Sequence, residues 1–313
     1  MTEPFVRPDV RAFLDSYAAL GLPALSKVPL DMLRAQAGVA SAFDLPRTPL
    51  AIRRDFVLPG PAGPISARLY DKRETRADGP VMVYFHGGGF CLGDIASHDS
   101  FVGSIAQTLD IPVVSVAYRL APENPWPAAP DDAEASARWV SENMPCTGLV
   151  LAGDSAGANL AIVTAMALRN GPASQPVLLH WAIYPLVAAD AGAFESGREF
   201  REGYLLGRED MAFFDMSYQG DPASWRYAPL GHDMSGMPPA LVTTAGLDPL
   251  RDQGRAYVDA LKTAGVRTLL REASGNIHGY CTFRQAIPSA VDDVTGDLAA
   301  LKGLLAELTR VTS

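Results

Sequence analysis

The sequence predicts a doubly wound α/β domain, in which a mostly parallel sheet is covered by helices on both faces. Apolar residues make up 48% of the 313 residues, which is enough for a large core and is not typical of a disordered chain. Several short apolar segments run without polar interruption, as strands do when both faces of a sheet are buried. Helical stretches lie between many of these segments, and this alternation favours parallel strands joined by helices.

The first segment, residues 1–45, is expected to be helical. Pro8 and Asp9 are suited to start a helix, and Gly21 is suited to end one. Apolar residues between them recur at spacings of three and four, so they share one helix face, which needs an apolar partner. These residues are Val10, Phe13, Leu14, Tyr17 and Leu20.

Eight segments suited to strands follow. They cover residues 52–57, 65–70, 81–85, 111–118, 149–152, 177–184, 240–245 and 266–270. Helices are expected over residues 99–109, 131–144, 158–169, 252–264 and 289–309. The interval 186–232 holds no strand candidate and is rich in aromatic and charged residues. We interpret it as a helical insertion above the sheet; an ordinary crossover is the alternative, although such a length is unusual for a plain connection.

Ser155 is the strongest candidate for a reactive residue. It is the centre of a Gly-Asp-Ser-Ala-Gly motif that joins a predicted apolar strand to a predicted helix. A nucleophile on a sharp strand-to-helix turn needs small neighbours, and Gly153 and Gly157 meet that need. The helix that begins after Ser155 points its positive dipole end and free N–H groups at the hydroxyl. The motif in this context predicts a nucleophilic serine.

A second motif, His86 followed by Gly87 to Gly89 and Phe90, comes directly after a predicted strand. Consecutive glycines let the backbone approach a substrate closely and turn its N–H groups inward. Such donors stabilise the negative charge that develops on an ester carbonyl oxygen when a serine attacks it. A flexible turn or a phosphate-binding loop is the alternative, but a phosphate loop usually carries a lysine after its glycines, and none stands here.

A serine nucleophile needs a histidine base and an acid that orients the base. The expected chain order is serine, acid, histidine. Two of the five histidines precede Ser155 and His180 lies mid-strand, so His232 and His278 remain. His278 is the better candidate, because it comes later in the chain than a strand end at which the acid could lie. His232 does not. That acid is best assigned to Asp248, for which a simple helix-capping role is the alternative.

Charge and cysteine content exclude several classes of partner and site. The chain has 26 basic and 35 acidic residues, and its net charge of −9 disfavours nucleic acid or an anionic membrane as the main partner. Three cysteines without Cys-x-x-Cys spacing argue against a disulfide framework and a structural zinc site. Their sparse use, with an N-terminus that lacks a signal-peptide pattern, leads us to expect a cytoplasmic protein.

Together these motifs resemble those of the hormone-sensitive-lipase-like branch of the α/β-hydrolases, the family IV to which many bacterial carboxylesterases belong. The resemblance covers about residues 50–310. The matching motifs, in the family's order, are His86-Gly-Gly-Gly-Phe90, Tyr118-Arg-Leu-Ala-Pro-Glu123 with Pro127 and Pro130-Asp-Asp132, Gly153-Asp-Ser-Ala-Gly157, Asp248-Pro-Leu-Arg-Asp252 and Ile277-His-Gly-Tyr280. Two departures are Gln253, where the family often has an acid, and Tyr280, where it often has phenylalanine.

The resemblance implies an α/β-hydrolase fold with an eight-stranded, mostly parallel sheet and a helical cap. It implies a catalytic triad of Ser155 as nucleophile, Asp248 as acid and His278 as base. The implied oxyanion hole consists of the backbone N–H groups of Gly88, Gly89 and Ala156, supported by His86 and Gly87.

By the same resemblance, the cap consists of residues 1–45 and 186–232, and the catalytic domain of residues 46–185 and 233–313. The cap would close an acyl pocket, although for any one aromatic residue ordinary packing within the cap is the favoured alternative. The candidate pocket residues are Phe90, Tyr184, Phe200, Tyr204, Leu205, Phe213 and Phe214.

The implied function is that of a serine carboxylesterase that hydrolyses short- to medium-chain esters through an acyl-enzyme intermediate. Its partners would be a small-molecule ester and water, with no metal or cofactor, no nucleic acid and no stable membrane association. Exposed edges of the sheet could support a homodimer. An amidase or an acyltransferase would use the same triad and stays open. A non-catalytic ligand-binding protein on the same fold is a further alternative, which the presence of His278 disfavours.

Overall fold

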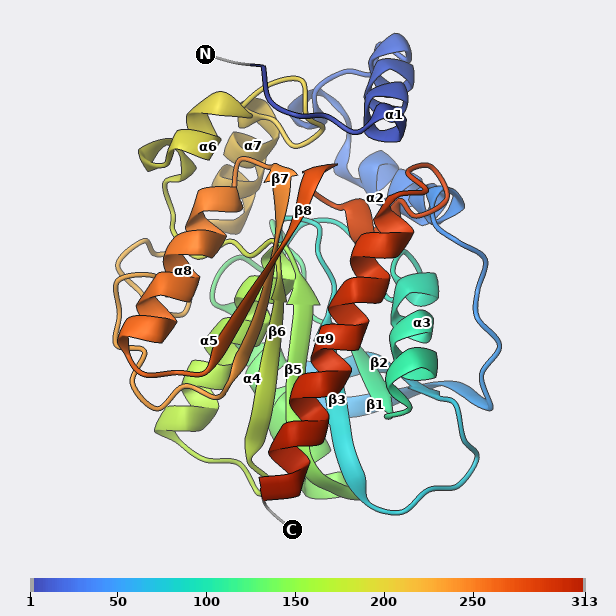
Figure 1. Cartoon of the computed structure of the whole chain (residues 1–313), viewed down its shortest axis with the longest axis vertical. Coiled ribbons are helices and arrows are strands. Elements are labelled where there is room, and N and C mark those ends of the chain that lie inside the picture. The colour runs from blue at the N-terminus through green and yellow to red at the C-terminus, as the bar shows by residue number, and fades with distance from the viewer. Residues whose placement is uncertain (1–2, 312–313) are drawn as a thin grey trace.

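The computed structural model describes residues 3–311, apart from the side chains of residues 36–41 and 309–311 (Figure 1). Residues 1–2 and 312–313 of the predicted domains therefore lie outside the described residues. The strands are β1 (Ile52–Gly60), β2 (Gly63–Asp71), β3 (Gly79–Phe85), β4 (Val113–Ala117), β5 (Cys146–Asp154), β6 (Val177–Ile183), β7 (Ala240–Leu247) and β8 (Thr268–Ile277). The α-helices are α1 (Pro8–Ala19), α2 (Leu30–Ala40), α3 (Asp99–Leu109), α4 (Ala128–Asn143), α5 (Ala156–Asn170), α6 (Glu195–Glu199), α7 (Arg208–Tyr218), α8 (Arg251–Thr263) and α9 (Ala290–Val311).

The strands form one sheet in the order β1-β2-β4-β3-β5-β6-β7-β8. Strand β2 pairs antiparallel with both β1 and β4, and every other pairing is parallel. The predicted mostly parallel, eight-stranded sheet is therefore confirmed. Because the parallel strands share one direction, the residues that follow β3, β5, β7 and β8 come together at the same end of the sheet.

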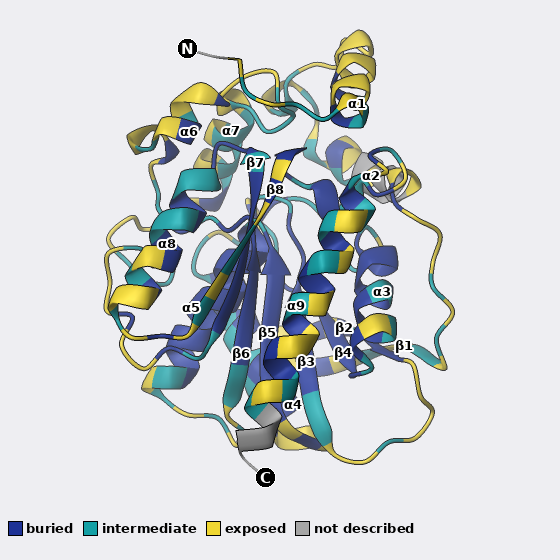
Figure 2. Cartoon of the chain, in the orientation of Figure 1, coloured by how far each residue is buried: buried dark blue, intermediate teal, exposed yellow. Residues whose placement is uncertain are grey.

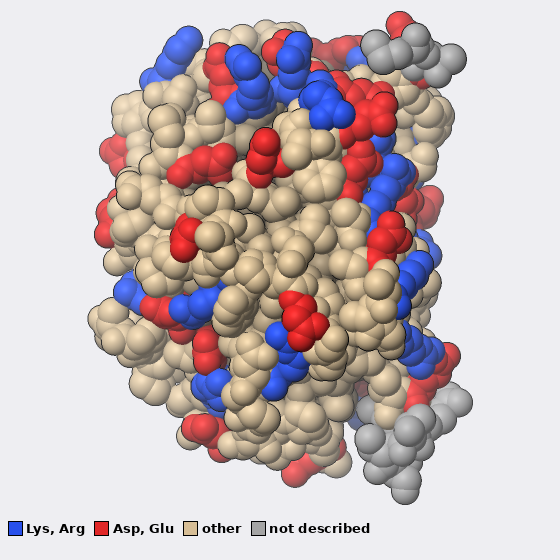
Figure 3. Space-filling view, turned by 90° about the vertical axis from the view of Figure 1, so that its left-hand side faces the viewer, with Lys and Arg blue, Asp and Glu red and all other residues tan. Residues whose placement is uncertain are grey.

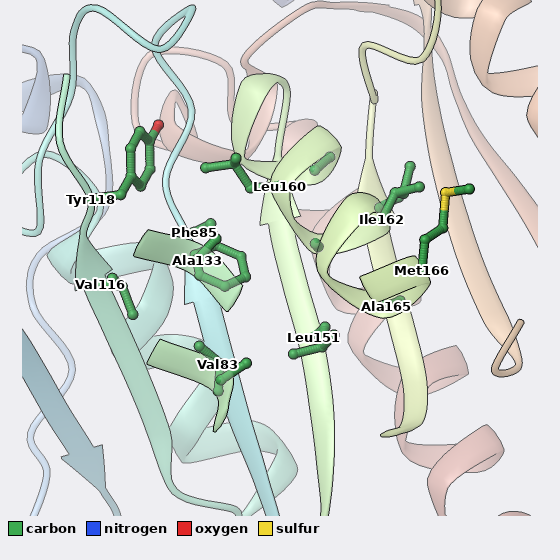
Figure 4. Packing of buried hydrophobic residues seen from close by; sticks show 14 of the residues in the cluster. Val83, Phe85, Val116, Tyr118, Ala133, Leu151, Leu160, Ile162, Ala165 and Met166 are labelled. Atoms are coloured by element: carbon green, nitrogen blue, oxygen red, sulfur yellow. The ribbon is translucent and has the colours of Figure 1, made fainter. Parts of the chain in front are cut away.

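Helices cover both faces of this sheet, with α4, α5 and α8 on one face and α3 and α9 on the other (Figure 1). Each face has its own cluster of buried apolar side chains. Figure 4 shows part of the first cluster, in which Val83 and Leu151 lie on neighbouring strands and Ala133, Leu160 and Ala165 belong to the covering helices. The central strands are buried while the outer helix faces are exposed (Figure 2), as expected of strands without polar alternation.

Helix α1 covers the sheet with only part of its apolar face. Val10 and Leu14 are buried in the cluster beneath α9, but Leu20 is 62% exposed and Tyr17 is 37% exposed. The prediction that all five apolar residues need an apolar partner is therefore wrong for Leu20. The helix ends at Ala19 and lies beyond the carboxyl end of the sheet, at the top of Figure 1.

Strand β8 is longer than the sequence predicted, since it continues to Ile277 rather than ending at residue 270. It is an edge strand, and Arg271 and Glu272, which point to opposite faces, pair with Asp297 of α9 and Arg255 of α8. These polar residues interrupt the apolar pattern. This extension brings His278 to the carboxyl end of the sheet.

The predicted insertion, residues 186–232, contains no strand in the structure. It holds a short 3-10 helix (Ala191–Ala193), α6 and α7, joined by irregular segments. It lies above the carboxyl ends of the strands, beside α1 (Figure 1). Gln253 of α8 anchors its start, because the Gln253 side-chain oxygen accepts the backbone N–H groups of Val187 and Ala188. Gln253 thus supplies an acceptor oxygen where the family often has an acid.

On the face drawn in Figure 3, basic and acidic side chains are interspersed, and no broad basic area appears there. Within the described residues, no helix is both long enough and apolar enough to span a bilayer.

Candidate active site

Ser155 lies on the sharp turn between β5 and α5, with φ 56° and ψ −118°. This left-handed conformation is rare for a residue with a side chain, and its neighbours must pack closely to hold it. A Cβ on Gly153 or on Gly157 would collide with the carbonyl oxygen of Phe85. The two glycines therefore let the turn lie directly against the end of β3.

The turn places the Ser155 hydroxyl beside His278. Nε2 of His278 lies 2.8 Å from Oγ of Ser155, and Nδ1 of His278 lies 2.7 Å from Oδ2 of Asp248. Because a carboxylate can only accept, Nδ1 carries the proton and Nε2 is free to accept the serine proton. The structure thus brings the three predicted residues into one hydrogen-bond chain.

Asp248 is fully buried at the end of β7, and its second carboxylate oxygen accepts the N–H of Leu250 at 2.8 Å. This bond fixes the carboxylate that faces His278. Asp252 lies on α8, as predicted, where it accepts the N–H of Ser196 at 2.9 Å. His180 is buried in β6 against the Tyr257 hydroxyl, and His232 is exposed. Neither of these histidines approaches Ser155 through a hydrogen bond.

The glycine loop after β3 faces the same hydroxyl. Gly88 has φ 117° and Gly89 has φ 60°, and a Cβ on Gly89 would overlap the ring of Phe214. In the described structure, the backbone N–H groups of Gly88, Gly89 and Ala156 donate to no protein acceptor. All three residues line the cavity in front of Ser155. They are therefore free to donate to an oxygen placed there.

His86 lies beneath this loop rather than in front of Ser155. Its Nδ1 is 2.8 Å from the carbonyl oxygen of Gly87, and its ring stacks on Tyr118 with a centroid distance of 4.4 Å. The Tyr118 hydroxyl in turn donates to the His86 carbonyl at 2.7 Å. Burial lowers the pKa of His86 to about 4, so the ring is neutral at pH 7. These contacts are consistent with the predicted role of His86, which is to support the glycine loop.

A cavity of about 340 Å³ opens in front of Ser155 and His278. Three of the predicted pocket residues line it, namely Phe90, Leu205 and Phe214. The cavity also has lining residues that the sequence did not indicate as pocket residues. They are Tyr17, Leu25, Leu92, Leu186, Leu206, Met211, Tyr218, Tyr227, Leu250 and Phe283. Most are ordinary apolar residues in separate segments, and no sequence signal marks them.

The other four predicted pocket residues are not among the residues that line the cavity. Tyr184 is buried beneath His278, with ring centroids 4.5 Å apart, and its hydroxyl contacts Sγ of Cys281. Phe200 is buried and packs against Tyr204 and beneath the Arg251 guanidinium. Phe213 packs edge-on against Phe214 from outside. These aromatic residues stabilise the walls, as the alternative interpretation of ordinary packing expected.

Charged groups in the cavity wall are few. Among the described residues, its lining includes no Lys or Arg, and its carboxylates are Asp154, Asp210 and Asp215. Asp210 caps α7 by accepting the N–H of Gly207 at 3.0 Å, and burial raises its pKa. Within the described residues, no group of three or more His, Cys, Asp or Glu side chains is arranged to hold a metal ion.

Comparisons with known proteins place the chain among ester hydrolases. Residues 82–282 match the family model described as alpha/beta hydrolase fold. The esterase LipI of Mycobacterium tuberculosis is 37% identical over 279 residues, which cover 84% of this chain and 86% of LipI. The ethyl acetate hydrolase of Pseudomonas putida is 34% identical over 249 residues, covering 76% of this chain and 78% of that protein. A hyperthermophilic esterase from the archaeon Pyrobaculum calidifontis superposes with a TM-score of 0.89 at 36% identity, covering 96% of this chain and 99% of that one.

Proposed function

The chain belongs to the α/β hydrolase family as a carboxylesterase, and we propose that it hydrolyses short- to medium-chain esters through an acyl-enzyme intermediate on Ser155. The observation that carries this proposal is the unbroken hydrogen-bond chain from Asp248 through His278 to the Ser155 hydroxyl, which faces the cavity. A serine, a base and an orienting acid in this order are the groups that acyl transfer requires.

In the proposed reaction, Oγ of Ser155 attacks the ester carbonyl carbon while Nε2 of His278 takes the hydroxyl proton. Asp248 keeps the imidazole in the correct tautomer and stabilises its charged form. The imidazolium then protonates the leaving alcohol, which departs from the acyl-enzyme. Water enters, His278 removes one of its protons as the water oxygen attacks the acyl carbon, and the imidazolium then returns that proton to Oγ of Ser155 as the carboxylic acid leaves.

We assign the oxyanion hole to the N–H groups of Gly88, Gly89 and Ala156. Each is free of a protein acceptor and lines the cavity beside Ser155. Donors that are fixed before the reaction stabilise the developing oxyanion, and the loss of one such donor typically costs about 3 kcal/mol of transition-state stabilisation. His86 and Gly87 are assigned the support of this loop.

The size and walls of the cavity support the proposed substrate range. Its volume of about 340 Å³ is near the lower end of small-molecule pockets, which span about 300–1,000 Å³. Tyr17 and Leu25 contribute from the N-terminal segment and Leu205 and Phe214 from the insertion, which supports the proposal that residues 1–45 and 186–232 form a cap. An apolar wall of this size fits a short or medium acyl chain.

A cytoplasmic location is part of the proposal, and the three free, buried cysteines support it. A small-molecule ester and water are the proposed reactants. The homodimer stays a prediction, with the edge strand β8 as one candidate surface.

The test is a series of p-nitrophenyl esters from acetyl to palmitoyl, hydrolysed by the wild type and by Ser155→Ala. We expect the highest kcat/KM at short to medium acyl chains and a loss on the order of a million-fold in the variant. A folded wild type that turns over no ester of the series would contradict the proposal. Equal turnover of matched amides, or transfer to added alcohols in preference to water, would instead support an amidase or an acyltransferase.

A further inference from the structure

Asp154 and His98 form a second buried carboxylate–imidazole pair beside the proposed triad. Asp154 directly precedes Ser155 and is 4% exposed, and His98, at the start of α3, is 7% exposed. Nε2 of His98 lies 3.1 Å from Oδ1 of Asp154. Both residues line the cavity in front of Ser155, yet the proposed reaction gives neither of them a task.

Oδ1 of Asp154 connects the nucleophile turn to the glycine loop. It accepts the N–H of Gly87 at 2.8 Å and the Tyr84 hydroxyl at 2.7 Å. A Cβ on Gly87 would collide with this carboxylate, so the two segments pack directly against each other. Because Gly87 immediately precedes Gly88, this hydrogen bond fixes the start of the segment that presents the proposed oxyanion donors.

The groups around His98 suit a ring that is protonated on both nitrogens. Oγ of Ser97 donates its only proton to the carbonyl oxygen of Asp94 at 2.8 Å, so it can only accept from Nδ1 of His98, which lies 2.9 Å away. Nε2 faces the Asp154 carboxylate, which also can only accept. An imidazolium, with a proton on each ring nitrogen, gives a donor to both of these acceptors at once.

Burial and charge act in opposite directions on this pair. Burial lowers the pKa of His98, but the charge and hydrogen bond of Asp154, with the charges of Asp94 and Asp44, raise it above its ordinary value. Burial likewise raises the pKa of Asp154, but His98 and the Tyr84 hydroxyl lower it to about 2. The neighbouring His86 is neutral at pH 7, so it adds no charge there.

We propose that Asp154 and His98 are positioning residues for the ester hydrolysis: the carboxylate holds the oxyanion loop, and the imidazolium neutralises that carboxylate beside the developing oxyanion. This inference rests on the proposed function. An uncompensated carboxylate one residue from the nucleophile would oppose the negative charge of the tetrahedral intermediate. Loss of the His98 proton therefore lowers kcat on the alkaline side of the pH profile.

The test measures kcat and KM for p-nitrophenyl butyrate from neutral pH to about pH 10, with the enzyme-free rate subtracted. Asp154→Ala leaves the Gly87 N–H without an acceptor, so we expect kcat to fall on the order of 100-fold with little change in KM. His98→Gln leaves the Asp154 carboxylate without a compensating charge. We therefore expect the kcat of this variant to begin its alkaline decline at a lower pH than the kcat of the wild type.

Asp154→Asn keeps an oxygen that can accept from Gly87 but removes the charge, so the alkaline decline disappears. For the same reason, the double variant Asp154→Asn/His98→Gln has a higher kcat than His98→Gln alone at alkaline pH. A purely structural role predicts no such recovery. If His98→Gln does not fold, the pH dependence of kcat in Asp154→Asn tests the proposal by itself.

Asp71→Asn is the matched control, because Asp71 is a buried carboxylate paired with Arg76 at the opposite end of the sheet. It should keep the wild-type profile. The inference is overturned if active Asp154 and His98 variants keep the wild-type alkaline decline, if they change KM alone, or if the double variant is no better than His98→Gln. A wild type that is as inactive as Ser155→Ala contradicts the proposed function itself, which is a distinguishable result.

Discussion

The backbone at Ser155 adopts a conformation that costs about 1–3 kcal/mol for a residue with a side chain. Close packing against β3 holds it, because Gly153 and Gly157 bring the turn against the Phe85 carbonyl. The hydroxyl is thereby fixed at the end of the hydrogen-bond chain that starts at Asp248. The proposed reactivity of Ser155 therefore depends on Gly153 and Gly157 as much as on Asp248 and His278.

The first prediction concerns Gly157→Ala. The added Cβ would collide with the backbone oxygens of Phe85 and His86, so we expect the free energy of unfolding to fall by about 1–3 kcal/mol, with loss of esterase activity. Gly303→Ala is the control, because Gly303 lies in α9 with open space around it. There, better helix propensity should raise the free energy of unfolding by up to about 1 kcal/mol. Urea titration measures both, and a stabilised Gly157→Ala would contradict the packing argument.

The sequence predicted which three side chains meet at Ser155, because each of them follows a strand end. Ser155, Asp248 and His278 all follow strands, and parallel strands bring their carboxyl ends together. Asp154 could not be assigned in the same way, since its partner His98 lies far away in sequence and follows no strand directly. Only the folded chain shows that the two residues meet.

Among the elements, α7 shows why the pocket was harder to predict than the reactive residues. Phe213 and Phe214 are adjacent in sequence, but only Phe214 lines the cavity, where its ring packs against Gly89. Successive helical residues point about 100° apart, and the sequence does not show which face of a short insertion helix meets the sheet. Phe200 and Tyr204 lie in the irregular segment between α6 and α7, where the sequence likewise does not show which way a side chain points.

The second prediction uses this adjacent pair. Phe214→Ala removes a ring from the cavity wall, so we expect the preferred acyl chain in the ester series to become longer. Phe213→Ala is the matched control, because it removes the same side chain from outside the cavity and should leave the chain-length preference unchanged. The ratio of kcat/KM for octanoyl and butyryl esters measures the change. An equal shift in both variants would contradict the assignment of the wall.

For the molecule as a whole, the pattern of apolar strands was sufficient to predict the sheet and both of its helical layers. The bounds of edge strands and the burial of segments outside the sheet were harder to predict. Solvent on one side of such a segment permits polar residues, which interrupt the apolar pattern. Strand β8 and the exposed second half of α1 are the two cases. The fold also buries ionisable groups within the two clusters, which makes stability depend on pH.

The third prediction follows from these buried groups. Burial lowers the pKa of His86 and of His180 to about 4, below the ordinary histidine value of about 6.5. As the pH falls from about 6.5 toward 4, these two histidines bind protons in the unfolded chain but stay neutral in the folded chain. The free energy of unfolding therefore falls. Asp297 acts in the opposite direction, because burial raises its pKa to about 6 and the folded chain keeps a proton there.

His180→Gln isolates one of these groups away from the active site. Each differing proton contributes about 1.4 kcal/mol per pH unit, so the variant should show a slope smaller by about that amount between pH 6 and pH 4.5. Urea titration at several pH values measures the slope. An unchanged slope would mean that His180 is not held neutral in the folded chain.

In the proposed reaction, Ser155 carries the acyl group during ester hydrolysis. The most direct test mixes the protein with a p-nitrophenyl ester, stops the reaction with acid within one turnover, and locates the acyl group by peptide mass spectrometry. We expect one acyl group per chain, on the peptide that contains Ser155, and none in Ser155→Ala. A wild type that releases nitrophenol in a burst while the acyl group lies on another residue, or on none, would contradict it.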